Sequence, residues 1–98
     1  MAYGYRAAWK TLETYWKHFH STKQPYNVTT IIGRWAPPTE NATRNYIDTV
    51  SRETGIPATR KLSFDNKKVM CDIVAAMIKV ECGMSIDRDI IESGYDLL

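Results

Sequence analysis

Hydrophobic positions recur at helical spacing along most of the chain. In the first segment, large apolar residues lie four, three, four and three positions apart: Tyr5, Trp9, Leu12, Trp16 and Phe19. This spacing places them on one face of an α-helix. We therefore expect a helix from Tyr3 to about His20. Its aromatic stripe should face the core rather than a ligand, because core-facing helices carry such stripes.

A short second helix is predicted from Val28 to Trp35. Its apolar residues share one face, Asn27 can cap its first turn, and Arg34 suits the negative end of its dipole. Pro37 disfavours helical geometry for the residue before it, so the helix should end at this point.

The second half of the chain predicts three further helices. The third should begin near Glu40 or Asn41 and run to Thr54, with Gly55 after its last turn. Residues 56–64 form an extended connection. The fourth should run from Asn66 to Cys82 behind an Asp65 cap, with an apolar arc wide enough for a central helix. The last should span about Ile86–Glu92, and Gly94 should stop it.

The pattern predicts a compact all-α bundle of four to five helices. No segment of useful length alternates as a strand does, and no internal repeat occurs. With 98 residues, of which 44% are hydrophobic, the chain suits a single domain spanning residues 1–98.

Charge and cysteine content narrow the function classes. The net charge is only +2 and the basic residues are scattered, which disfavours nucleic acid as a partner. No apolar run resembles a signal peptide or a membrane span, so we expect a cytoplasmic or virion-associated location. Cys71 and Cys82 lie eleven positions apart in one predicted helix, about 16 Å along its axis, and should be free thiols.

The chain offers little recognisable catalytic chemistry. His18 and His20 lie two positions apart in a helix and point to different sides, so no metal site is expected. No phosphate-binding glycine loop or nucleophile motif occurs, and no cofactor is expected.

Glu81 is an unusual residue at the end of the fourth helix. An acid there opposes the helix dipole by about 0.3–1 kcal/mol. A structural explanation is an exposed glutamate, or an ion pair with Arg34 or Arg88. A functional explanation is an active-site acid.

The segment "RWAPPTEN", residues 34–41, is too constrained for an ordinary connection. It is either a rigid structural corner or a surface that presents Arg34, Trp35, Glu40 and Asn41 to a partner, since Trp and Arg are favoured at binding hot spots. We expect Trp35 to be largely buried against residues 77–81, with Arg34 in reach of Glu81.

Three segments carry a resemblance to a family of bacteriophage and prophage proteins, labelled virion or structural proteins. They are "YGYRAAWKTLETYW", "IIGRWAPPTENATRNYIDTVSRETGI" and "AMIKVECG", and "RWAPPTEN" is the most specific part. Longer relatives carry an asparagine-rich segment upstream of the part similar to "YGYRAAW", so this chain resembles their C-terminal part. The amide of their Glu-Asn-Gly is replaced here by Cys82.

The constrained loop, the resemblance and the lack of a recognisable catalytic set lead to two alternative functions, of which we favour the first. The first is a non-catalytic phage- or prophage-derived accessory module that binds a protein partner, or cell-wall peptidoglycan, through the surface around "RWAPPTEN". The second is a lysozyme-like peptidoglycan-cleaving domain with Glu81 as general acid. A glycosidase normally pairs two carboxylates, and Glu40 is the other candidate.

Overall fold

The structure, a computed structural model, describes residues 2–35 and 39–98; the side chains of residues 2–6 and 40 lie outside this description. Within these ranges the chain forms helices and no strand, which confirms the predicted all-α class. No described helix is both long enough and apolar enough to cross a membrane. The helices are α1 (Ala2–Ser21), α2 (Val28–Trp35), α3 (Glu40–Thr54), α4 (Lys67–Cys82) and α5 (Arg88–Asp96).

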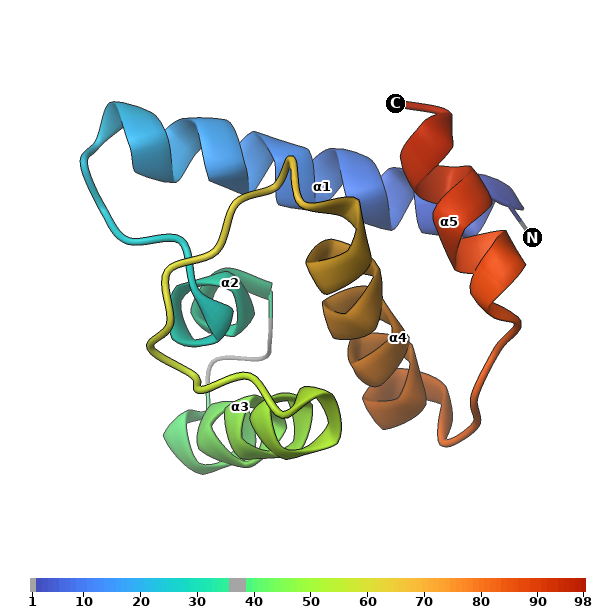
Figure 1. The fold of residues 1–98 in the computed structure, drawn as a ribbon. Coiled ribbons are helices and arrows are strands. Elements are labelled where there is room, and N and C mark those ends of the chain that lie inside the picture. The colour runs from blue at the N-terminus through green and yellow to red at the C-terminus, as the bar shows by residue number, and fades with distance from the viewer. Residues whose placement is uncertain (1, 36–38) are drawn as a thin grey trace.

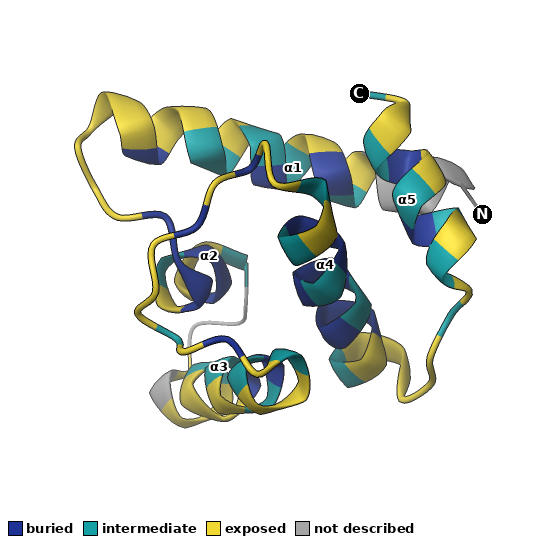
Figure 2. Cartoon of the chain, in the orientation of Figure 1, coloured by how far each residue is buried: buried dark blue, intermediate teal, exposed yellow. Residues whose placement is uncertain are grey.

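The helices pack in a chain of neighbours around α4. The long α1 crosses α5, α5 packs on α4, α4 on α3, and α3 on α2 (Figure 1). Buried positions occur on several sides of α4 and on the inner faces of the other helices (Figure 2). This arrangement confirms that the fourth helix is the central one. Its buried residues are Met70, Cys71, Ile73, Val74, Ala76, Met77 and Ile78.

Trp9 anchors α1 to the C-terminal helix. Its side chain is fully buried, and its indole N–H donates a 3.0 Å hydrogen bond to the backbone oxygen of Ile91. The ring meets Phe64 and Tyr95 edge-on, with centroids 6.0 and 5.2 Å away. The predicted core role of the α1 aromatic stripe is therefore confirmed at this position.

The start of α2 and the ends of α3 and α4 follow the predicted local rules. Asn27 Oδ1 accepts a 2.9 Å hydrogen bond from the backbone N–H of Thr30, as an N-cap should. Gly55 and Gly83 adopt φ of 72° and 70°, the left-handed conformation that glycine tolerates best.

Two predicted boundaries are wrong. The N-cap of α4 is Asn66, whose side chain accepts from Val69 N–H, and not Asp65. The last helix runs from Arg88 to Asp96, so Gly94 is buried within it instead of ending it. The reason is tertiary: the final turn brings Tyr95 onto Trp9, and this contact outweighs the helix penalty of glycine, about 1 kcal/mol.

Candidate functional site

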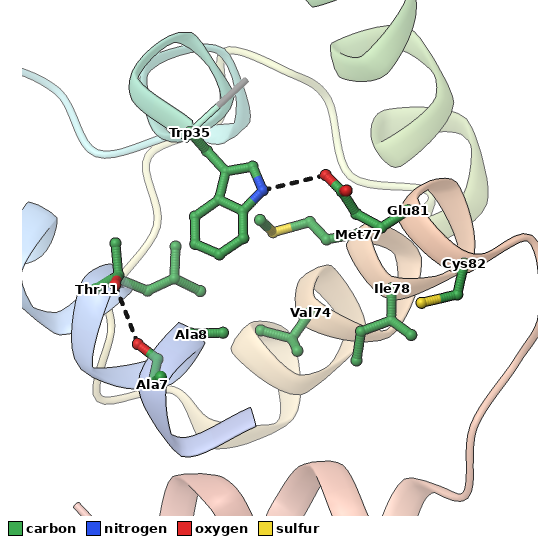
Figure 3. A pocket seen from close by; sticks show the side chains of 10 residues that line it. Ala7, Ala8, Thr11, Trp35, Val74, Met77, Ile78, Glu81 and Cys82 are labelled. Atoms are coloured by element: carbon green, nitrogen blue, oxygen red, sulfur yellow. Dashed lines mark hydrogen bonds between the residues drawn. The ribbon is translucent and has the colours of Figure 1, made fainter. Parts of the chain in front are cut away.

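A hollow of about 360 Å³ opens between α1, the end of α2 and α4, and we call it the Trp35 hollow (Figure 3). Its wall from α1 is made of Ala7, Ala8, Thr11 and Leu12. Its wall from α4 is made of Val74, Met77, Ile78, Glu81 and Cys82, and Trp35 closes one side. Most of these groups are apolar, so the hollow suits an apolar ligand group.

Trp35 points from the last turn of α2 toward the C-terminal end of α4 (Figure 3). Its indole N–H lies 3.4 Å from Glu81 Oε1, and its ring packs on the edge of the core. The predicted position beside residues 77–81 is confirmed. The burial is only partial, because the indole forms a wall of the hollow and keeps one part in contact with solvent.

The carboxylate of Glu81 joins three helices. Besides the Trp35 indole, the Tyr46 hydroxyl of α3 donates to the same Oε1 at 3.0 Å. Tyr46 is buried, and its hydroxyl also lies 3.4 Å from the backbone oxygen of Met77. Burial, followed by the negative charge of Glu81, raises the pKa of the Tyr46 phenol above its ordinary value. Tyr46 therefore stays a neutral donor to Glu81.

Of the two structural explanations for Glu81, the exposed glutamate agrees with the structure, and the ion pairs with Arg34 and Arg88 are wrong. The Arg34 guanidinium lies over the rings of Tyr15 and Phe19, 5.4 and 5.9 Å from their centroids, and not beside Glu81. Successive helical residues point about 100° apart, so an α2 that directs Trp35 toward α4 directs Arg34 elsewhere. Arg88 pairs with Asp72 at 2.8 Å.

The structure brings together only part of the "RWAPPTEN" segment and the hollow. Trp35 lines the hollow, whereas the exposed Arg34 and Asn41 do not. The side chain of Glu40 and the residues 36–38, which include the double proline, lie outside the described residues. The roles of Arg34, Trp35, Glu40 and Asn41 in binding stay predictions.

The described lining residues include one carboxylate and one exposed thiol. Glu81 carries the carboxylate, and Cys82 is a free, exposed cysteine. Cys71 is also free but buried, so the two thiols are unbridged as expected. Over the described part of the chain, no group of three or more His, Cys, Asp or Glu residues could hold a metal ion.

Sequence reasoning missed the hydroxyl of Tyr46 and the small residues of α1. The spacing of Tyr46, Ile47 and Val50 in the sequence indicates a buried face of the third helix and says nothing about the hydroxyl. A tyrosine at a buried position nevertheless needs a hydrogen-bond partner, and this requirement could have directed attention to Glu81. Ala7 and Ala8 leave room beside the indole, yet alanines in a helix carry no pattern that marks a hollow.

The described residues define a small all-α fold with a carboxylate-edged apolar hollow between α1, α2 and α4. The chain is similar to "Protein P5" of Pseudoalteromonas phage PM2, with 36% identity over 95 residues that cover 96% of this chain and 55% of that protein. The chain thus spans about half the length of this relative. No family model and no solved structure matches. The likeness supports a phage-related protein, while the family motif and the C-terminal position stay predictions.

Proposed function

We propose that this chain is a non-catalytic phage- or prophage-derived module that binds a protein partner at the Trp35 hollow. The observation that carries the proposal is the composition of the hollow: an indole, aliphatic side chains and two alanines surround it, with one carboxylate at its edge. A buried apolar or aromatic anchor is the common centre of a protein–protein hot spot.

The carboxylate at the edge of the Trp35 hollow indicates which partner side chain the hollow would hold. Glu81 is exposed and uses Oε1 for both the Trp35 and Tyr46 donors. The hollow therefore favours an apolar partner side chain that is flanked by a lysine, an arginine or a backbone N–H. A glycan would call for more polar groups than these walls supply, so a protein is the better partner.

The peptidoglycan-cleaving alternative has no specific observation in its favour. Among the described residues that line the hollow, Glu81 has no second carboxylate for a glycosidase pair. Its two described donors come from Tyr46 and Trp35, which explains the acid as a junction between helices.

A lysine scan on helix surfaces tests the proposal. Ala7 is exposed and lines the hollow, so Ala7→Lys introduces a long cation there at little cost in helix propensity. Ala42 is also exposed and helical but does not line the hollow, so Ala42→Lys is the matched control.

The assay is a pull-down from phage-producing bacteria, followed by identification of the retained protein and titration of the purified pair. We expect Ala7→Lys to weaken the purified complex at least tenfold and Ala42→Lys to leave it unchanged. Equal binding by both variants, or sedimentation of the wild type with purified peptidoglycan in place of a protein, would contradict the proposal.

A further inference from the structure

A second hollow, of about 570 Å³, lies at the opposite end of α1 from the Trp35 hollow. We call it the Trp16 hollow. Trp16, His20 and Lys23 come from the end of α1 and its following turn, Tyr26 from the connection to α2, and Lys61 from the loop before α4. Aromatic and cationic side chains therefore meet in one cavity of a size typical for a small ligand.

The two lysines supply unbalanced positive charge. Neither Lys23 nor Lys61 forms an ion pair with any residue that the structure describes. Among the described residues that line the hollow, none is acidic. Both residues are exposed. An ammonium group on a flexible stem is a common ligand of phosphate.

Lys23 also occupies a backbone position that lysine avoids. Its φ is +57°, and the N–H groups of Lys23 and Gln24 bond back to the oxygens of His20 and Phe19 at 3.3 and 2.8 Å. These bonds form the helix-ending motif whose left-handed residue is usually glycine. A lysine there costs stability, and strained positions of this kind cluster at binding sites.

The walls of the hollow are linked in advance. The backbone N–H of Leu62, next to Lys61, donates to the oxygen of Tyr26 at 2.8 Å. The Tyr26 hydroxyl donates to the oxygen of Leu12 in α1 at 2.9 Å. Tyr26 also packs edge-on against Trp16, with ring centroids 5.0 Å apart. The loop that carries Lys61 and the aromatic wall are thus held side by side before a ligand arrives.

We propose that the Trp16 hollow binds single-stranded nucleic acid, with a base against the partly exposed indole of Trp16 and a phosphate at Lys23 and Lys61. Aromatic rings and cationic side chains in one groove are the two elements of such recognition, because every base has a π-face. An acidic peptide would use the lysines but not the indole. The scattered basic residues of the sequence disfavoured nucleic acid as a partner. Folding changes this expectation because it gathers two lysines that are distant in sequence.

The test uses the fluorescence anisotropy of a labelled ten-nucleotide thymidylate strand. The variants are Lys23→Gly and Lys61→Gln, and the control is Lys68→Gln, which removes the same charge from an exposed lysine that lies outside the hollow and pairs with Asp72 at 3.8 Å. We expect each hollow variant to reduce the slope of log affinity against log salt by about 0.7, the value for one lost single-strand phosphate contact. The control should leave the slope and the affinity unchanged.

Lys23→Gly separates binding from folding. Glycine relieves the left-handed strain at this position, so the melting temperature of the Lys23→Gly variant should equal or exceed that of the wild type, while its affinity for the strand falls. Unlabelled thymidine monophosphate should compete weakly and the unlabelled strand strongly. Absent binding at low salt, equal binding by the control and the hollow variants, or equally strong competition by polyglutamate would each overturn the proposal.

Discussion

Replacement of Trp35 by alanine measures how far the indole at the end of α2 supports the fold. A fully buried Trp→Ala change costs about 3–5 kcal/mol. Trp35 is only partly buried at the edge of the core, so we expect about 2–3 kcal/mol for Trp35→Ala. The 3.4 Å contact of its N–H with the exposed Glu81 is long, so it contributes less than the roughly 0.5–1.5 kcal/mol of a typical hydrogen bond.

The loss is a large share of the roughly 5–15 kcal/mol that stabilises a small domain. Each kcal/mol lowers the melting temperature of a chain of this size by about 4–8 °C, so Trp35→Ala should melt about 10–20 °C lower. Thermal and urea unfolding followed by circular dichroism measure it. Trp35→Phe is the control: it keeps a ring on the core edge and should lose about 1 kcal/mol or less. If Trp35→Ala melts within a few degrees of the wild type, the indole contributes no stability and our structural reasoning is refuted.

Further predictions concern backbone, pH and the Glu81 junction. Gly33→Ala should raise the free energy of unfolding by about 0.5–1 kcal/mol, because Gly33 is helical with open space around it. Gly83→Ala should lower the free energy of unfolding by about 1 kcal/mol, because the φ of Gly83 is +70°. Urea unfolding of the two variants checks both signs. Burial raises the pKa of Tyr26 and Tyr46, so the stability that these neutral phenols give the folded state is complete below their unfolded pKa of about 10 and falls as pH rises above it. Tyr46→Phe should therefore lose less stability than the wild type in alkaline solution. An identical dependence of stability on pH in the two proteins would contradict this prediction. At neutral pH the same Tyr46→Phe should cost about 1 kcal/mol, and this cost should shrink in a Glu81→Met background, which removes the acceptor, if the 3.0 Å hydrogen bond is its source.

The helices could be predicted from the sequence because their signals are local. The spacing of apolar residues on α1, the Asn27 cap and the glycine after α3 each act within a few residues, and each was found as predicted. The extension of α5 could not be predicted in this way. It depends on the meeting of Tyr95 with Trp9, 86 positions away, and such a contact has no local signature.

The two hollows escaped prediction for a related reason. The spacing within α1 shows that Trp9 and Trp16 share a face, but not that α4 leaves room beside Ala7 and Ala8. Likewise, Lys61 reads as one of many exposed lysines until the bond between Leu62 and Tyr26 brings its loop to the end of α1. A cavity is a property of how elements meet, so sequence gives its residues but not their assembly.

Glu81 shows how a broken local rule should be interpreted. An acid at the end of α4 opposes the helix dipole, and the sequence suggested an exposed glutamate, an arginine partner or a reaction as the explanation. The structure shows an exposed glutamate that also accepts hydrogen bonds: Tyr46 and Trp35, from two other helices, donate to one carboxylate oxygen at 3.0 and 3.4 Å. The acid is thereby placed at the edge of the Trp35 hollow. A role in folding and a role in binding are therefore compatible at this residue, since the contacts that hold the indole also set the position of the charge that a partner would meet.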